Sequence, residues 1–282
     1  MRRNETSDSP PIALSIAGLD PSGGAGVLAD VRTFAAFACF PTAAITSLTF
    51  QNTTGVSGAV HQTGETVRAQ VLPIVADFSI AGAKTGMLPT REVIVEVARL
   101  FKETDLPAPV VDPVMRATSG DDLIDDDAVD CLISDLFPTA ALVTPNIPEA
   151  ERLTGLTIFN EPTMREAAQR IRGLGARAVL VKGGHLLTQR QAESGVQSER
   201  REAIDVFDEN GSVTVLRAEL ISGGEVHGSG CTLSASIAAC LARGMSLAES
   251  VETAKRFVAT AIMNAPAIGH GSRPLFGVRW LA

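Results

Sequence analysis

Short apolar stretches of strand length alternate with longer amphipathic stretches along most of this chain, and this alternation limits the possible folds most strongly. The predicted strands are 12–17, 43–50, 80–84, 109–112, 141–143 and 178–181. The predicted helices are 27–38, 65–76, 91–102, 126–136 and 164–174. Repeated strand–helix units predict an α/β fold, with a mainly parallel sheet and helices on both faces. In such folds a ligand binds at the carboxyl ends of the strands.

The last third of the chain has a different pattern. Residues 203–207 and 213–217 flank Glu209-Asn210-Gly211, which predicts a β-hairpin. Helices are expected at 229–242 and 247–264, and the polar segment 188–202 is expected to be a mobile loop. Because the sequence contains no internal repeat or linker, we expect one domain over 12–282 after a loose N-terminal tail of residues 1–11.

Composition narrows the class of protein. The chain has 282 residues, of which 45% are hydrophobic, enough for one large core. A net charge of −8 argues against a nucleic-acid or membrane partner, and no apolar run reaches the roughly 18 residues of a membrane helix. The first residues lack the hydrophobic stretch of a signal peptide. The four cysteines form no CxxC pair, which argues against structural zinc. We therefore expect a cytoplasmic protein with reduced thiols.

The common nucleotide-binding motifs are absent or incomplete. Gly24-Ala25-Gly26-Val27-Leu28-Ala29 matches the dinucleotide pattern, but residues 44–51 contain no carboxylate that could hold a ribose. No Gly-Lys dipeptide occurs, which excludes a P-loop, and the protein-kinase HRD and DFG motifs are missing. A protein with this sequence that uses a nucleotide must hold its phosphates in another way.

Gly228-Ser229-Gly230-Cys231-Thr232 at the start of a predicted helix offers such a way. Small residues let backbone N–H groups turn inward, and the helix start adds positive potential, so the segment can hold an anion. A thiol at a helix N-terminus has a lowered pKa, so Cys231 is a candidate general base for an attacking alcohol. The alternative is a glycine-rich helix start with a packing cysteine.

The motifs of this chain together resemble one family. His227-Gly228-Ser229-Gly230-Cys231-Thr232 and Ile16–Gly26 carry its two glycine-rich signatures. Further matches, in the family's order, are Gln51-Asn52-Thr53, Lys84–Leu88, Asp112–Met115, Ser119–Asp121, Thr144–Asn146, Glu149-Ala150, Lys182–His185 and Gly269–Gly271. The chain thus resembles the hydroxymethylpyrimidine/phosphomethylpyrimidine kinases of the ribokinase superfamily from about Ile12 to its C-terminus.

The resemblance implies a single-domain, ribokinase-like three-layer sandwich and a particular reaction. Such an enzyme moves the ATP γ-phosphoryl group to 4-amino-5-hydroxymethyl-2-methylpyrimidine and then to its monophosphate, giving the diphosphate used in thiamine biosynthesis. ATP is the co-substrate and Mg²⁺ the cofactor. A homodimer is also implied.

Residue by residue, the resemblance places five positions in the pyrimidine pocket: Gly18, Asp30, Gln51, Met87 and Val114. The amide of Gln51 offers a donor and an acceptor together, which suits an aminopyrimidine edge. A methionine at that position marks relatives that accept pyridoxal. From the residues alone, Gln51 can also be a solvent-facing polar residue, and Asp30 a carboxylate on a helix surface.

The resemblance also assigns catalytic, nucleotide and metal residues. It gives Cys231 the role of catalytic base, with Gly228, Ser229 and Gly230 beside it, and places Lys182, Thr232 and Lys255 at the nucleotide. Asn146 and Glu149 lie one helical turn apart and organise Mg²⁺ in such relatives, usually through water. The pair also fits an N-terminal capping arrangement, and Lys182 fits a snorkelling lysine.

Two alternatives remain open at this point. One is a pyridoxal or pyridoxine kinase on the same fold, against which Gln51 argues. The other is a non-catalytic pyrimidine-binding regulator, against which the glycine-rich helix start, Cys231 and the Asn146/Glu149 pair argue.

Overall fold

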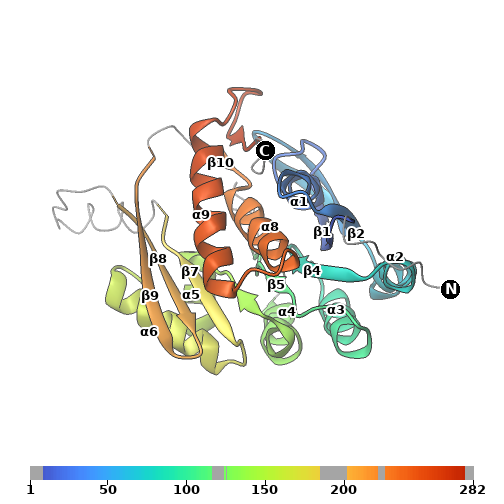
Figure 1. Ribbon diagram of the computed structural model, residues 1–282, viewed down its shortest axis with the longest axis horizontal. Coiled ribbons are helices and arrows are strands. Elements are labelled where there is room, and N and C mark those ends of the chain that lie inside the picture. The colour runs from blue at the N-terminus through green and yellow to red at the C-terminus, as the bar shows by residue number, and fades with distance from the viewer. Residues whose placement is uncertain (1–8, 116–123, 125, 185–201, 222–225, 277–282) are drawn as a thin grey trace.

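A nine-stranded sheet forms the centre of the protein (Figure 1), with strand order β3-β2-β1-β4-β5-β6-β7-β8-β9. The computed structural model describes residues 9–115, 124, 126–184, 202–221 and 226–276. The strands are β1 Ile12–Leu19, β2 Phe40–Asn52, β3 Gly55–His61, β4 Ile80–Thr85, β5 Val110–Val111, β6 Leu142–Val143, β7 Ala178–Lys182, β8 Glu202–Glu209 and β9 Ser212–Glu219. The six strands from β2 through β7 in this order pair in parallel, while β3, β8 and β9 are antiparallel. The predicted mainly parallel sheet is confirmed.

Helices lie in the connections between the parallel strands, and two more helices follow β9 along the chain. They are α1 Gly26–Ala36, α2 Gly64–Asp77, α3 Arg91–Glu103, α4 Asp126–Cys131, α5 Ile147–Thr154, α6 Glu161–Gly173, α8 Ser229–Ala242 and α9 Leu247–Met263. Side chains at the N-cap positions Thr63, Thr90, Asn160 and Ser246 accept backbone N–H groups and so fix where α2, α3, α6 and α9 begin. A short pair, β10 Val226–His227 and β11 Arg273–Pro274, joins the last part of the chain to the start of α8.

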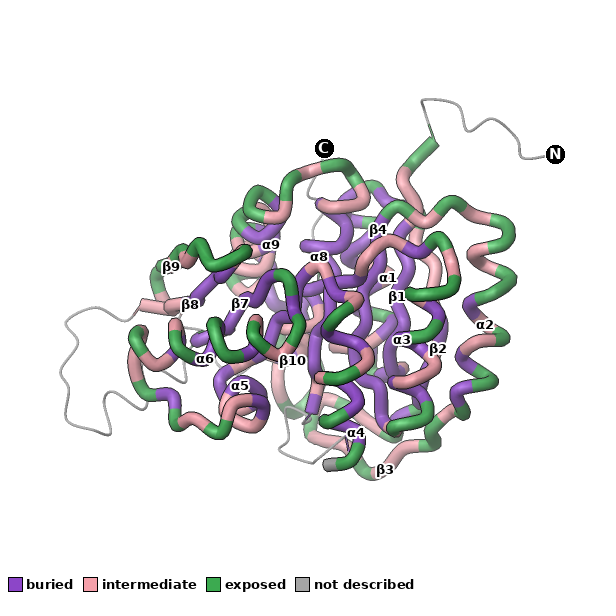
Figure 2. The backbone as a smooth tube through the Cα atoms, turned by 90° about the horizontal axis from the view of Figure 1, so that it is seen from below, coloured by how far each residue is buried: buried purple, intermediate pink, exposed green. Residues whose placement is uncertain are grey.

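Buried residues run along the central strands (Figure 2), and the alternating side chains of these strands divide the core into two layers. Val111, Val143 and Val179 pack with α3, α4, α5 and α6 on one face. Their neighbours Val110, Leu142 and Ala178 pack with α1, α8 and α9 on the other. Both faces are covered, which explains why the short parallel strands are continuously apolar rather than alternating. The result is the three-layer α/β/α sandwich that the sequence predicts.

The structure differs from the sequence-based prediction in three elements. β3 was not expected, because Gly55 and Gly58 interrupt its apolar pattern, yet it pairs antiparallel with the end of β2. α5 was recognised only as the turn carrying Asn146 and Glu149. The expected helix 126–136 continues from α4 as a π-helical turn over Leu132–Leu136. The predicted loop 188–202 lies outside the described residues except for Glu202, which begins β8, and of the tail 1–11 only residues 9–11 are described.

The predicted hairpin is confirmed as β8 and β9. Asn210 and Gly211 both have positive φ, of 53° and 91°, which is the backbone conformation that a two-residue hairpin turn requires.

Among the described helices, none combines the length and apolar character needed to cross a bilayer.

Candidate active site

Residues from the carboxyl ends of β1, β2 and β4 come together at one edge of the sheet. A Cβ added to Gly18 would lie 3.1 Å from the sulfur of Met87, so Gly18 leaves room for that side chain. The Thr46 hydroxyl donates to the Met87 carbonyl at 2.6 Å, and the Thr49 hydroxyl donates to the Leu19 carbonyl at 2.9 Å. These contacts tie the three strand ends together.

Gln51 and Val114 stand at the same edge. Gln51 is partly exposed near the end of β2, and its side-chain amide lies 3.0 Å from His227 Nε2. Val114 is also partly exposed and follows β5 after Asp112, whose carbonyl accepts the Val114 N–H. Four of the five residues expected around the pyrimidine therefore end on this edge.

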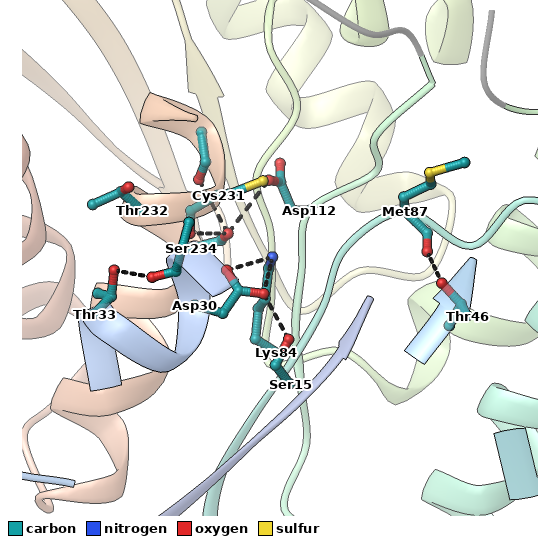
Figure 3. Close-up of polar contacts among 12 residues, drawn as sticks. Ser15, Asp30, Thr33, Thr46, Lys84, Met87, Asp112, Cys231, Thr232 and Ser234 are labelled. Atoms are coloured by element: carbon teal, nitrogen blue, oxygen red, sulfur yellow. Dashed lines mark hydrogen bonds and ion pairs between the residues drawn. The ribbon is translucent and has the colours of Figure 1, made fainter. Parts of the chain in front are cut away.

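Asp30 differs from the expectation. Its side chain is fully buried in α1, where the Lys84 ammonium lies 3.0 and 2.9 Å from its two oxygens and the Ser15 hydroxyl donates at 2.6 Å (Figure 3). It forms an internal ion pair, so it neither lines an open pocket nor lies on the helix surface. Burial raises the pKa of Asp30 above its ordinary value, although Lys84 and Ser15 oppose that shift. The helical pattern alone could not reveal its partner on β4.

The glycine-rich segment Gly228–Thr232 forms the beginning of α8. Gly228 is the N-cap with φ of 84°, and the helix starts at Ser229. The Thr232 N–H is the first to bond inside the segment, to the Gly228 carbonyl at 2.9 Å. The N–H groups of Ser229, Gly230 and Cys231 therefore precede the helical hydrogen-bond ladder, as an anion-binding helix start requires.

The two glycine-rich loops of the chain are interlocked. A Cβ on Gly228 would lie 1.9 Å from the Gly24 carbonyl oxygen, and one on Gly24 would lie 2.3 Å from His227 Cδ2. No side chain fits at either position without moving the backbone or the imidazole. The loop before α1 thus rests directly on the loop before α8.

The electrostatics of Cys231 correct one expectation. Its thiol is partly buried beside Lys84, Asp112 and Asp30, with the Gly26 N–H directed at the sulfur. Burial raises the pKa of Cys231 to about 11, and the two carboxylates add to this, while Lys84 and the Gly26 N–H oppose it. The predicted lowering by the helix N-terminus is therefore wrong for this site, because desolvation of the thiolate is the larger effect.

Lys182 lies at the base of this helix start. Its ammonium is 2.9 Å from Asp112 Oδ1, and a Cβ on Gly230 would be 3.2 Å from the Lys182 nitrogen. Ser234 donates to Asp112 Oδ2 at 3.3 Å. Lys182 is thus held by Asp112 beneath the start of α8 rather than extended into solvent. Thr232 is buried in the first turns of α8, and its carbonyl accepts the Ser236 hydroxyl.

Lys255 is placed differently. Its ammonium pairs with Asp205, which also accepts the Gly183 N–H at 2.9 Å. A Cβ on Gly183 would lie 2.0 Å from the Ile204 carbonyl oxygen, so the segment after β7 is tightly fixed there. Lys255 therefore supports the turn after Lys182 through Asp205.

Asn146 and Glu149 form the capping box of α5. Asn146 Oδ1 accepts the Glu149 N–H at 2.9 Å, and Glu149 Oε2 accepts the Asn146 N–H at 2.7 Å. Burial raises the pKa of Glu149 to about 7, with Lys182 opposing and Asp112 reinforcing the shift. The capping alternative is therefore confirmed. In the described part of the chain no group of three or more His, Cys, Asp or Glu side chains is arranged to hold a metal ion.

Sequence reasoning gave no individual role to three residues of this region. Asp20, Lys84 and Asp112 were quoted only as members of motifs, yet each is buried and bonded to another site residue. Each ends or follows a parallel strand, a position that favours contact with a ligand or its neighbours. Their partners are 54 to 207 residues away in the chain, so the sequence shows the positions but not the pairings.

Comparison with known proteins agrees with this architecture. The family model for phosphomethylpyrimidine kinase matches residues 20–276. The hydroxymethylpyrimidine/phosphomethylpyrimidine kinase of Rhizobium meliloti is 43% identical over 94% of this chain and 96% of its own length. A thiamine biosynthesis bifunctional protein of Geobacter sulfurreducens is 42% identical over 93% of this chain, which spans 51% of that longer protein.

Solved structures give the same result for the fold. The ADP complex of Bacillus subtilis pyridoxal kinase has a TM-score of 0.83 and 33% identity over 95% of this chain and 97% of its own. A phosphomethylpyrimidine kinase of Clostridium difficile has a TM-score of 0.75 and 34% identity over 89% of this chain and 99% of its own. The fold and the glycine-rich helix start define a small-molecule kinase of the ribokinase-like class. Within that class, the chain belongs to the phosphomethylpyrimidine kinase family.

Proposed function

We propose that this protein phosphorylates 4-amino-5-hydroxymethyl-2-methylpyrimidine with ATP, and then phosphorylates the resulting monophosphate, to supply the diphosphate for thiamine biosynthesis. The family and its ATP-dependent phosphotransferase chemistry come from the matches over nearly the whole chain. The observation that carries the substrate assignment is Gln51 at the sheet edge, beside the start of α8.

The proposed chemistry follows from the positions of the groups. The substrate hydroxyl oxygen attacks the γ-phosphorus, the bond from that phosphorus to the bridging oxygen breaks so that ADP leaves, and the hydroxyl proton passes to the thiolate form of Cys231. The N–H groups at the start of α8 and the Lys182 ammonium face the charge of the moving phosphoryl group, which is where phosphoryl transfer needs stabilisation. Both steps use the same groups, because both transfer to an oxygen on the same substituent.

The residues present fit Mg²⁺ held mainly through water. Glu149 is a buried carboxylate whose pKa is raised by burial, so a cation beside it would favour its ionised form, and the Asn146 side chain lies one turn away. Mg²⁺ keeps several waters and takes only one or two carboxylates beside substrate phosphates, so no larger acidic cluster is required. When bound, the ion supplies charge neutralisation to the phosphates. Asn146 and Glu149 would hold it.

Replacement of Cys231 tests the base assignment. Cys231→Ala should lower kcat by roughly 10²–10⁴-fold, the usual contribution of general-base catalysis, with the fold intact. Cys240→Ala is the matched control, because Cys240 lies on the same helix but is fully buried in the core. Turnover of Cys231→Ala at the rate of the control would remove Cys231 from the mechanism.

Substrate choice separates the proposal from a pyridoxal kinase, the name borne by the Bacillus subtilis structural relative. ADP release should follow addition of the hydroxymethylpyrimidine or its monophosphate, with pyridoxal turned over far more slowly. Gln51→Met should narrow that difference. Turnover of pyridoxal alone would overturn the substrate assignment, and binding without ADP release would favour a regulator.

We also propose that the protein is a cytoplasmic homodimer with one domain over residues 12–282. Four free cysteines suit a reducing compartment. A single sheet connects β3 to β9, which supports one domain. On β2 and β3, the apolar side chains Leu48, Phe50 and Val60 are 39%, 53% and 51% exposed, and Leu48 lies opposite Val60 in the strand register. This face is the one we assign to the second copy.

A further inference from the structure

His227 connects the substrate edge of the sheet to the loop before α1. Its Nε2 lies 2.9 Å from Asp20 Oδ2 and 3.0 Å from the side-chain amide of Gln51. The imidazole is nearly buried, and the absence of a side chain at Gly24 lets it pack directly on that backbone. A ring fixed in this way presents one nitrogen to two polar groups at once.

The first of these groups is an ionised carboxylate. Asp20 Oδ1 accepts the N–H and the hydroxyl of Ser22 at 2.9 and 2.7 Å, and Oδ2 accepts the Ala25 N–H at 2.9 Å. Burial raises the pKa of Asp20, but hydrogen bonds from His227 and Ser22 outweigh it and leave the pKa below its ordinary value. Because a carboxylate only accepts hydrogen bonds, the His227 Nε2 must carry a proton.

A protonated Nε2 decides which atom of Gln51 can face it. An imidazole N–H has no lone pair for a second donor, so an amide N–H pointing at it would oppose donor to donor. The amide oxygen of Gln51 lies 3.2 Å from the Thr49 hydroxyl oxygen. The single proton of that hydroxyl is already given to the Leu19 carbonyl, so two oxygen acceptors would face each other without a proton between them. A half-turn of the amide about its terminal torsion exchanges oxygen and nitrogen without moving any other atom.

That half-turn removes both mismatches. The Gln51 oxygen then shares the His227 Nε2 proton with Asp20 Oδ2 in a bifurcated hydrogen bond, and the Gln51 nitrogen donates to the Thr49 oxygen. We propose that Asp20 and His227 are positioning residues that hold the Gln51 amide with its oxygen toward the imidazole and its nitrogen toward Thr49. One N–H and one oxygen lone pair of the amide remain for a ligand.

The orientation has a consequence for specificity that rests on the proposed function. The amide presents its acceptor on the His227 side and its donor on the Thr49 side. A ligand that pairs with both must offer an amino group toward His227 and a ring nitrogen toward Thr49, which describes an aminopyrimidine bound in one of its two possible directions. A ligand with the opposite order of donor and acceptor would meet two mismatched groups, a penalty larger than that of a single lost hydrogen bond.

Binding measurements test the positioning role. His227→Leu should weaken binding of the hydroxymethylpyrimidine about 10-fold, the value of a lost orienting hydrogen bond, and leave ADP affinity within about 2-fold. His227→Gln, which keeps an N–H for Asp20 and Gln51, should restore most of the loss. In a Gln51→Leu background, His227→Leu should raise the dissociation constant of the hydroxymethylpyrimidine by less than about a further 2-fold, because the oriented amide is gone. Titration calorimetry measures these constants. Equal losses in both backgrounds would overturn the proposal, and His61→Ala, an exposed histidine, is the control.

A spectroscopic measurement keeps this inference separate from the proposed function. With only four histidines, ¹⁵N-labelled imidazoles can be assigned in the ligand-free protein. The His227 proton should reside on Nε2, and Asp20→Asn should change that signal while Gln51→Leu should not alter its protonation. A wild-type protein that does not bind the pyrimidine would overturn the proposed function. An unprotonated His227 Nε2 would overturn the inference, whatever the substrate.

Discussion

The Asp30–Lys84 ion pair is fully closed to solvent, with both side chains 0% exposed. A buried pair costs desolvation that its attraction only partly offsets, and loss of one partner leaves an unpaired charge. This pair lies beside Cys231, where Lys84 favours the thiolate and Asp30 opposes it. Its two members therefore have opposite effects on the proposed base.

Removing Lys84 should destabilise the protein more than removing both members of the pair. Lys84→Met leaves Asp30 buried without its counter-ion and should cost roughly 3–5 kcal/mol in the free energy of unfolding. The double variant with Asp30→Asn should regain a large part of that loss. Urea unfolding of the three proteins measures both values, and equal stability of the single and double variants would contradict the expectation.

The raised pKa of Cys231 gives a pH dependence with a definite sign. A thiol whose pKa is about 11 is mostly protonated at neutral pH, and only the thiolate accepts the substrate proton. The rate kcat/KM should therefore rise up to about tenfold per pH unit between pH 7 and 9. Asp30→Asn removes a negative charge near the sulfur, so its profile should shift to lower pH. A shift to higher pH would contradict this account.

At the scale of elements, α8 lies against β4 at a position that only glycine permits. A Cβ on Gly82 would lie 2.4 Å from the Ala238 carbonyl oxygen and 2.8 Å from the Ala242 side chain. The same helix carries Cys231 at its start, so a shift of α8 moves the proposed catalytic base and the backbone N–H groups beside it. The close approach of helix and strand thus sets the position of the site.

Gly82→Ala should lower stability by about 1–3 kcal/mol, the usual cost of overpacking, and should also lower kcat. Gly173→Ala in α6 is the matched control, because an added Cβ there meets nothing within 4 Å. It should be neutral or stabilise by up to about 1 kcal/mol. Thermal unfolding and turnover of both variants give the comparison, and similar losses in the two would contradict the packing argument.

The elements also show what the sequence could and could not predict. The parallel strands and long helices could be predicted from the sequence because their apolar periodicity determines them. The β8–β9 turn could be predicted from Asn210-Gly211. β3 was missed because Gly55 and Gly58 weaken its local pattern, while pairing with β2 determines it. The pKa direction of Cys231 and the burial of Asp30 depend on neighbours distant in the chain, which no local pattern contains.

At the scale of the whole molecule, one sheet carries both sets of ligand residues. β1, β2, β4 and the segment after β5 end at the residues proposed for the substrate, whereas β7 and α8 carry the groups proposed for the phosphates. Adjacent strands of one sheet join these positions, so under the proposed function the two ligands would meet over the carboxyl ends of that sheet.

The apolar face on β2 and β3 should decide the oligomeric state. Val60→Asp places a charge at its centre and should convert the proposed dimer to a monomer in sedimentation experiments, because an interface core excludes unpaired charge. Phe159→Asp is the control, since Phe159 is 54% exposed elsewhere in the structure. A wild-type monomer, or a Val60→Asp dimer, would refute the assignment of this face.

The interlocked glycine loops also determine when the site can exist during synthesis. His227 meets Asp20 across 207 residues of sequence, so about four fifths of the 282-residue chain must be made before these loops can touch. Contacts of such long range form late, because the connecting chain must first be ordered. A nascent chain synthesised only as far as α6 therefore contains β1, β2 and β4, which carry residues proposed for the substrate. It does not yet contain the start of α8, which carries the groups proposed for the phosphates. Competence for catalysis appears only when the final fifth of the chain emerges.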